Sequence, residues 1–491
     1  MDLINIDLVR ITDVSVIIEK LFEEKYSLHK YPKNNSLNQL KKYLAHLKQE
    51  LYVLIEYPYV DKVYRDSYYH YYSSKNQDFH RNCIRLSFFN EDISLDAFRD
   101  INSKVNIKTS YLGFLILRPT FPQIIGRSII SPEAVIKNTF RICLVDVDTT
   151  ANGLKLSVAG FPHSSQNSET ITCAETTIWS IMEYFGMKYP EYTPTLPSKI
   201  SSILSAQSFE RIWPSKGLTA QQISYALREL GFGVKVYSRI AYNQNFLEIL
   251  RMYIESGIPV VVAIQNNNGI GHAQCVIGRS RYDDDKIETL KMAEDFGNGV
   301  KVYNFECMDL DYIYMDDNHP PYVIGKLENP SGFYTQKEWQ GCSILNFVVP
   351  LYSKIYLDAG EARAYAKSVL KRYIANLKIL EEEEVVMKVF LASSRSYKDY
   401  LNGNPNLDPF VKELLLRSPM PKFIWIAEIS DKELLINDKV KGLLIIDATA
   451  TKHQALIAGL IGNTYFTENL NEILQINISL QPFESYQNNL H

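Results

Sequence analysis

The sequence lacks the features that mark several classes of protein. Its six cysteines are widely spread and none belongs to a CxxC pair, so neither a zinc ribbon nor a disulfide framework is expected. No apolar run approaches the ~20 residues that a helix needs to cross a bilayer. The first residues, MDLINIDLVRITDV, have acidic side chains in every apolar stretch and therefore do not resemble a secretory signal. These absences predict a protein of the reducing cytoplasm with no membrane association.

Basic residues are not in excess either. The formal net charge is −4, so the composition gives no reason to expect nucleic acid as a partner. The GK[ST] ending of a phosphate-binding loop and the HExxH of a zinc peptidase are both missing, and we expect no cofactor and no metal. What is present is a globular composition, 46% hydrophobic and 22% charged, in a chain of 491 residues that exceeds one ordinary core.

Changes in composition along the chain predict three parts. Residues 1–155 read as a mixed α/β domain, in which leucines at helical spacing predict a helix within 36–55. A small, polar stretch separates this domain from a central part, residues 156–355. Residues 356–491 again alternate helix-like and strand-like runs, as expected for an α/β region that could pack on the central part. The flanking parts carry no motif that we recognise, and they could gate a cleft, choose a substrate or bind a protein partner.

A cysteine stands at the predicted start of a helix in the central part. Residues 171–186, ITCAETTIWSIMEYFG, have apolar side chains at helical spacing and predict an amphipathic helix that ends at Gly186. The helix begins close to Cys173, where the positive end of the helix dipole favours a thiolate. A thiolate is the form of cysteine that attacks a carbonyl carbon. On this feature alone, a buried cysteine that merely begins a core helix is the favoured interpretation.

A histidine follows a glycine-containing turn about a hundred residues later. Residues 257–278, GIPVVVAIQNNNGIGHAQCVIG, predict a buried strand, a polar turn and a returning strand that begins near His272. Gly269 and Gly271 leave space beside this histidine for a substrate backbone. A histidine in this position is suited to act as a general base, although a hairpin histidine without a role fits the same pattern.

Two adjacent aspartates follow a further predicted strand. Residues 310–325, LDYIYMDDNHPPYVIG, alternate as a strand that ends in carboxylates, with Asp316 on one face and Asp317 on the other. A carboxylate at such a strand end can hold an imidazole in its working tautomer. Asp316 is the preferred candidate and Asp317 the alternative. Asn318 and His319 are weaker candidates because prolines follow them, and a solvated turn fits the same residues.

Residues 160–350 resemble the papain-like superfamily of cysteine peptidases. The likeness is greatest to its bacterial branch of peptidases that cleave double-glycine leader peptides. The motifs that carry it occur in order: Gln166, Cys173 with MEYFG, GLTAQQISYALRELGFGVKV, IPVVVAI, GHAQCVIG and the strand end at Asp316. The resemblance implies an α+β central domain in which the nucleophile helix packs against an antiparallel sheet that carries His272.

The resemblance also assigns roles to four residues. Cys173 is the expected nucleophile, His272 the base, Asp316 the residue that orients the base, and Gln166 the donor that stabilises the oxyanion together with the Cys173 backbone N–H. The 44 residues that separate the histidine from the aspartate exceed the expected spacing. An insertion, roughly RSRYDDDKIETLKMAEDFGNG, must therefore be looped out for the triad to form.

The residues that follow the nucleophile depart from the family pattern. Many relatives have glycine directly after the nucleophile, whereas this chain has Ala174 and then Glu175. A carboxylate so close to the thiol would raise the thiol pKa if it pointed inward.

Three functions agree with these observations. The first is a cysteine peptidase, or a related amide or isopeptide hydrolase, that acts on a peptide or protein through a thioester. The second is a catalytically inactive papain-like scaffold that binds peptides. The third is a transglutaminase-like acyl transferase, which uses the same thioester and passes the acyl group to an amine. The retained Cys, His, Asp and Gln favour the first over the second.

Overall fold

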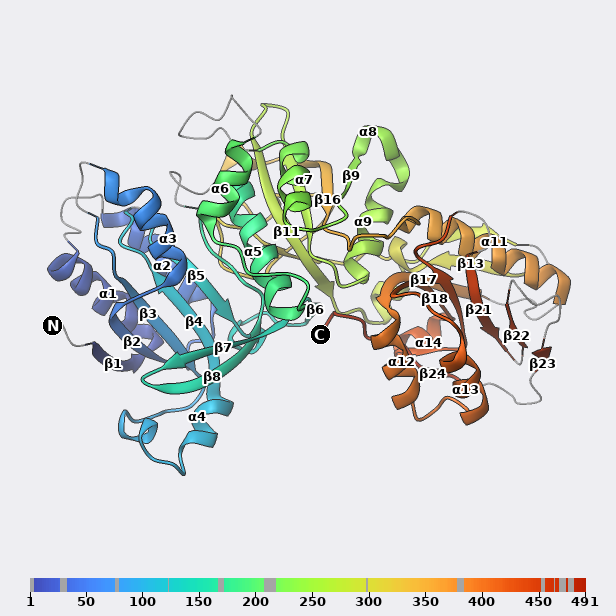
Figure 1. The fold of residues 1–491 in the computed structure, drawn as a ribbon, viewed down its shortest axis with the longest axis horizontal. Helices are drawn as coiled ribbons and strands as arrows, with labels where there is room; N and C mark the ends of the chain where they lie inside the picture. Colours follow the sequence, from blue (N-terminus) through green and yellow to red (C-terminus); the bar gives the residue numbers. More distant parts are fainter. Residues whose placement is uncertain are drawn as a thin grey trace.

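The computed structural model describes most of the chain, and every statement below concerns the residues that it describes. These are residues 4–26, 33–75, 79–121, 123–166, 172–206, 218–296, 299–377, 384–451, 455–462, 464–467, 474–475 and 481–491. Figure 1 shows three bodies of helix and sheet that follow one another along the long axis of the molecule. Helices and mainly antiparallel strands make the fold α+β. No helix within these ranges combines the length and apolar character needed to span a bilayer.

The N-terminal body is a five-stranded antiparallel sheet with four helices. Its strands pair in chain order: β1 (Asn5–Arg10), β2 (Tyr52–Tyr59), β3 (Cys83–Phe89), β4 (Tyr111–Leu117) and β5 (Ile125–Ile130). The helices are α1 (Ile11–Lys25), α2 (Lys33–His46), α3 (Lys62–His70) and α4 (Lys104–Ser110). The helix expected within 36–55 is α2, but it ends at His46. Of the buried leucines beyond it, Leu54 belongs to β2, whereas Leu47 and Leu51 lie between the helix and this strand.

A hairpin connects this sheet with the central body. It is formed by β7 (Val145–Ala151) and β8 (Leu154–Gly160), so residue 155 lies within it. Strand β8 packs on β4 and β5 of the N-terminal sheet, whereas β7 packs on the first helix of the central body.

The central body is built on a seven-stranded sheet in the order β15-β14-β11-β10-β16-β9, with β6 paired to β11. Its strands are β6 (Phe140–Ile142), β9 (Lys235–Ser238), β10 (Val260–Gln265), β11 (Gly271–Ser280), β14 (Tyr312–Met315), β15 (Val323–Gly325) and β16 (Ser343–Val349). Its helices are α5 (Cys173–Lys188), α6 (Pro197–Ser205), α7 (Ala220–Glu229), α8 (Arg239–Tyr242) and α9 (Phe246–Glu255). The antiparallel hairpin of β10 and β11 confirms the predicted strand, turn and returning strand.

Helix α5 differs from its prediction in two respects. It is buried on every side from Ala174 to Phe185, because β11, β7, α6 and α7 all pack around it, so it is not amphipathic. It also continues through Gly186 to Lys188. Gly186 does not stop the helix; it admits Pro194, whose backbone nitrogen would lie 2.3 Å from a Cβ added at that position. The lack of a side chain at Gly186 is therefore explained by the close approach of Pro194, and not by a helix end.

The C-terminal body contains an eight-stranded sheet. Its first two strands come from the chain segment between β11 and β14 of the central body. The strand order is β12 (Met292–Asp295), β13 (Lys301–Asn304), β17 (Glu384–Ser393), β18 (Phe423–Ser430), β20 (Gly442–Asp447), β21 (Leu456–Ile461), β22 (Thr464–Phe466) and β23 (Leu474–Gln475). Strands β19 (Lys439–Val440) and β24 (Phe483–Glu484) form a separate pair, and the helices are α11 (Ala359–Leu377), α12 (Ser394–Gly403), α13 (Pro409–Arg417) and α14 (Lys432–Ile436). Only the β13–β17 pair is parallel among the described pairs, so this sheet, like the N-terminal one, is antiparallel rather than α/β.

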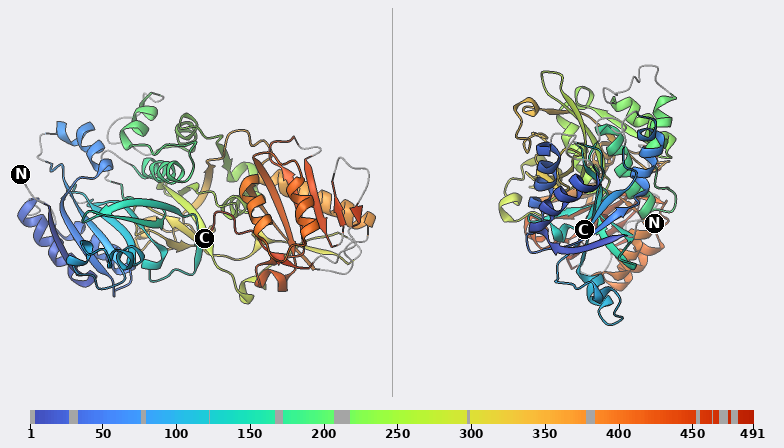
Figure 2. Two further views of the ribbon diagram at one scale, coloured as in Figure 1. Left: turned by 60° about the horizontal axis from the view of Figure 1, so that its bottom comes forward. Right: turned by 90° about the vertical axis from the view of Figure 1, so that its left-hand side faces the viewer.

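The expected insertion between β11 and β14 is an ordered structure. It contains the short helix α10 (Asp284–Ile287), and it then sends β12 and β13 into the C-terminal sheet beside β17 (Figure 1). The chain does leave the central sheet between the histidine and the aspartate, as the triad requires. The last residues return in the other direction, because His491 exchanges backbone hydrogen bonds with Ile142 of β6 (Figure 1 and the left view of Figure 2).

Candidate active site

Cys173 is the first residue of α5, and the helix start is built around it. Thr172 is the N-cap residue, and its backbone N–H and hydroxyl donate to Oε2 of Glu175 at 2.9 and 3.1 Å. Glu175 therefore caps the helix in a capping box, which explains a carboxylate so close to the nucleophile. Cys173 is partly exposed as a residue, unlike the four buried cysteines.

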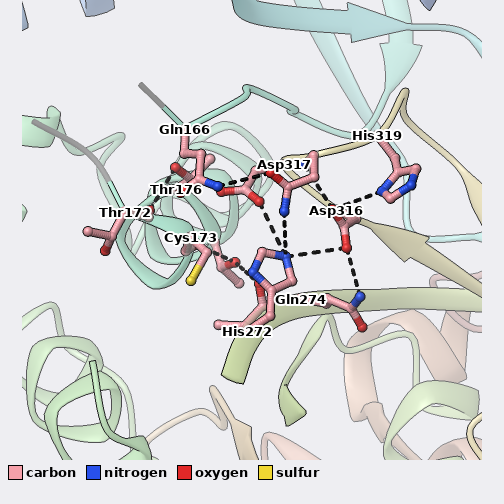
Figure 3. A network of polar contacts seen from close by, with 12 residues as sticks. Gln166, Thr172, Cys173, Thr176, His272, Gln274, Asp316, Asp317 and His319 are labelled. Carbon is pink, nitrogen blue, oxygen red and sulfur yellow. Dashed lines mark hydrogen bonds and ion pairs between the residues drawn. The ribbon is translucent and has the colours of Figure 1, made fainter. Parts of the chain in front are cut away.

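His272 is the second residue of β11 and pairs across the hairpin with Ile264 of β10. Its ring is buried, and Nε2 lies 3.3 Å from Asp316 Oδ2 and 3.3 Å from Asp317 Oδ1. Figure 3 shows the Cys173 sulfur on the opposite side of the ring, toward the other nitrogen. Cys173 is among the groups that raise the pKa of His272, so the structure brings the predicted nucleophile and base close together.

Asp316 is fully buried and surrounded by hydrogen-bond donors. Gln274 Nε2 and the Tyr334 hydroxyl donate to Oδ2 at 2.7 and 2.6 Å. The backbone N–H of Asn318 donates to Oδ1 at 2.8 Å, and His319 Nδ1 lies 3.2 Å from the same oxygen. Burial by itself pushes the pKa of Asp316 upward, but the charge of His272 and the hydrogen bonds with His272 and His319 hold it well below its usual range. Asp316 is therefore a fixed negative charge beside the ring.

Asp317 lies on the same side of the ring as Asp316, and the prediction that it faces the opposite way is wrong. Strand alternation does not extend to these residues, because β14 ends at Met315 and both aspartates lie in the turn that follows. The Asp317 carboxylate has no hydrogen-bond partner among the described residues beyond its ion pair with His272. Burial raises the pKa of Asp317 to about 7, with the charge of Asp316 acting in the same direction and that of His272 against it.

These charges determine the state of the imidazole. Burial alone lowers the pKa of His272, but the charge of Asp316, then that of Cys173, and hydrogen bonds to both raise it well above its usual value. Together these groups favour the protonated ring, which is the partner that a thiolate needs.

Gln166 lies at the same site, but its side-chain amide faces a neighbour rather than open space. Its Nε2 donates to Oδ1 of Asn318 at 2.9 Å, and Asn318 Nδ2 lies 3.5 Å from His272 Nε2 (Figure 3). Asn318 thus connects the predicted oxyanion donor with the base. Ser168 and Thr170, two cap-type residues before Cys173, lie outside the described residues, and the oxyanion role of Gln166 stays a prediction.

His272, Asp316 and Asp317 could also hold a metal ion, since one ligand atom from each lies within 4.8 Å of the others. The hydrogen bonds of Asp316 argue against that use. An ionised carboxylate has about four acceptor positions, and five groups around Asp316, His272 among them, already compete for them. The nitrogen that would bind a metal is also the one held between the carboxylates. The arrangement fits an oriented imidazolium better than a metal centre.

Three neighbouring residues were not identified from the sequence. The ring of Trp339 packs edge-on against His272 at 5.4 Å between centroids, and Tyr334 lies 5.2 Å from Trp339. His163 contacts the backbone carbonyl of Asp316 through Nε2 at 3.1 Å, and burial lowers its pKa to about 4, so the ring is neutral. The rings of Tyr334 and Trp339 lie in a loop, where no periodic pattern marks them. Only a motif such as His163-x-x-Gln166 could have indicated His163 from the sequence.

Comparison of the sequence with models of known protein families, and with curated proteins, gives no match.

Proposed function

We propose that the central part of the chain is a papain-like cysteine hydrolase, either a peptidase or a related amide or isopeptide hydrolase. One observation carries the proposal: the His272 ring lies between a helix-terminal cysteine and two buried carboxylates. A thiol, an imidazole and a carboxylate in this order are the groups that thioester chemistry needs.

The first half of the proposed reaction forms a thioester. The Cys173 thiolate, whose proton resides on His272, attacks the carbonyl carbon of the substrate. Negative charge moves to the carbonyl oxygen, to which the N–H groups at the start of α5 and the Gln166 amide would donate hydrogen bonds. As the tetrahedral intermediate collapses, the C–N bond breaks and the imidazolium gives its proton to the departing amine. The acyl group remains on sulfur.

The second half uses water in place of the amine. His272, now neutral, takes a proton from a water molecule while the water oxygen attacks the thioester carbon. The C–S bond then breaks, the carboxylic acid departs, and the thiolate is again paired with the imidazolium. Asp316 keeps the ring oriented through both halves, and it stabilises the positive charge that the ring carries in the resting state.

The two other functions use parts of the same arrangement. A peptide-binding scaffold would not need a buried imidazolium with its carboxylates, and burial costs several kcal/mol for each ion before pairing offsets it. That cost favours an active site over an inactive one. A transglutaminase-like transferase would form the same thioester and transfer it to an amine, so the products distinguish it from a hydrolase.

The proposal is tested by product analysis with matched cysteine variants. The purified full chain is incubated with a mixture of synthetic peptides, with and without added methylamine, and products are identified by mass spectrometry. We expect cleavage by the wild type and by Cys307→Ser, and none by Cys173→Ser, with all three folded by circular dichroism. Methylamides as the main product would favour the transferase. Undiminished cleavage by Cys173→Ser would overturn the proposal.

A further inference from the structure

A cavity of about 380 Å³ lies directly beside the candidate active site. Gln166 and Asn318 form part of its wall, and so do Tyr334 and Trp339, the two rings that pack near His272. Its volume falls within the range of about 300 to 1,000 Å³ that is typical of ligand sites. The opposite wall comes from the N-terminal body, through Lys42 and its neighbours on α2. The cavity therefore joins the site to a part of the chain that the proposed reaction does not use.

The position of the cavity relative to the base indicates which part of a substrate it would hold. In the proposed reaction the departing amine receives its proton from His272, so the leaving group must lie on the side of the imidazole. Trp339 packs against that ring and also lines the cavity. A chain that continues from the departing amine would therefore enter this space, whereas the acyl part stays on Cys173.

The charge of the walls indicates the chemistry of that group. Lys42 and His319 are the only side chains that can carry a positive charge among the described lining residues, and no carboxylate lines the cavity there. His319 already contacts Asp316, which leaves the Lys42 ammonium to face a ligand. Gln39, one turn earlier on α2, also lines the cavity, but its amide already donates to Gln123, so Lys42 carries the recognition.

We propose that this cavity binds the leaving-group side of the substrate and that Lys42 selects a carboxylate there, from an acidic side chain or from a free chain end. This inference rests on the proposed hydrolase function, and it gives the N-terminal body a role in choosing the substrate. The neighbouring Lys41 is equally exposed but does not line the cavity, so it provides a matched control.

The test compares leaving groups that differ only in charge. Peptides with one acyl part end in Ala-Asp-amide, Ala-Lys-amide, Ala-Ala-amide or Ala-Ala with a free carboxylate, and kcat/KM is measured for each. An exposed ion pair changes an affinity about 1.5- to 5-fold, so the wild type should prefer the Asp over the Lys peptide by about 2- to 10-fold. Lys42→Glu should reverse this preference, and Lys41→Glu should retain it. A gain with the free carboxylate alone would assign the site to a chain end.

A second measurement makes the inference independent of turnover. The dipeptides Ala-Asp-amide and Ala-Lys-amide are titrated by calorimetry into the full-length Cys173→Ser variant. The same titrations are made with Cys173→Ser proteins that also carry Lys42→Glu or Lys41→Glu. Tighter binding of Ala-Asp-amide that is lost only with Lys42→Glu would support the site. Equal binding of both dipeptides, or the same loss with Lys41→Glu, would overturn it. An enzyme that hydrolyses peptides without this preference refutes the inference alone, whereas cleavage that survives Cys173→Ser refutes the proposed function.

Discussion

Alkylation of the cysteines offers a sharp test of the site, because the chain contains its own control. Four of the six cysteines are buried, and only Cys173 and Cys307 are partly exposed. Their electrostatic surroundings are opposite. Cys173 contacts an imidazole, whereas burial, Glu248 and Glu306 raise the pKa of Cys307 to about 11. The Cys307 thiol also donates to Glu248 Oε1 at 3.7 Å. The two thiols are therefore similar in access and different in charge.

The expected difference in rate follows from the thiolate fractions. At pH 7.5 a thiol with a pKa of about 11 is ionised in roughly 3 of 10,000 molecules, and an ordinary cysteine with a pKa of about 8.5 in about one of ten. A more basic thiolate is a better nucleophile, with a Brønsted slope of about 0.4–0.5, which recovers about 10- to 18-fold. Cys307 should therefore react about 15- to 30-fold more slowly than an ordinary exposed cysteine. Cys173, which has an imidazolium partner and a helix N-terminus, should exceed that ratio over Cys307.

The assay is a time course with limiting iodoacetamide at pH 7.5, read by peptide mass spectrometry on the folded protein. His272→Ala should slow labelling of Cys173 and leave Cys307 unchanged, because only the first thiol contacts the ring. Equal rates for the two cysteines in the wild type would refute the ion-pair reasoning. So would a Cys173 rate that does not respond to the loss of the histidine.

Three further predictions concern the aspartates and one glycine. Asp316→Asn should lower kcat about 10- to 100-fold and change KM much less, because the lost charge acts on the base; steady-state kinetics would contradict this if KM alone rose. Asp317 has a folded pKa of about 7, above the ~3.9 of an unfolded aspartate, so its contribution to stability is complete below pH ~4 and is lost as the pH rises through 7. In the wild type, this loss lowers the free energy of unfolding by about 1.4 kcal/mol per pH unit for one proton. In Asp317→Asn, the free energy of unfolding, measured by thermal unfolding between pH ~4.5 and ~7.5, should therefore fall less steeply with pH. An unchanged slope would show that another group titrates. Gly186→Ala should destabilise the fold by about 1–3 kcal/mol because its Cβ would meet Pro194, whereas Gly403→Ala, with no atom within 4 Å of the added Cβ, should be neutral; equal denaturant midpoints would contradict this.

Local patterns were sufficient to place the candidate nucleophile and the candidate base. A cysteine at a helix start and a histidine at the start of a returning strand are both set by short-range geometry, and both elements begin where the sequence predicted. Asp316 followed from the end of a strand. Asp317 was misplaced because alternation was extended one residue past Met315, where the strand has already become a turn.

The features that the sequence did not predict depend on non-local contacts. The role of Gly186 depends on Pro194 folding back against the helix, and helix propensity does not indicate that contact. The burial of α5 on all sides likewise depends on elements that arrive later in the chain. Tyr334 and Trp339 reach the site from a loop between β15 and β16, where no periodic pattern marks a residue for function.

The parallel pairing of β13 with β17 has a consequence for synthesis of the protein. The histidine and its aspartate are both translated before residue 384, where β17 begins. Until then β13 is an open edge, a row of backbone groups ready to pair with any other strand. A shortened version that ends near residue 355 would keep this open edge permanently, although every residue of the proposed triad is present. We therefore expect such a fragment to aggregate, and the central part of the chain to need the C-terminal sheet as its folding partner.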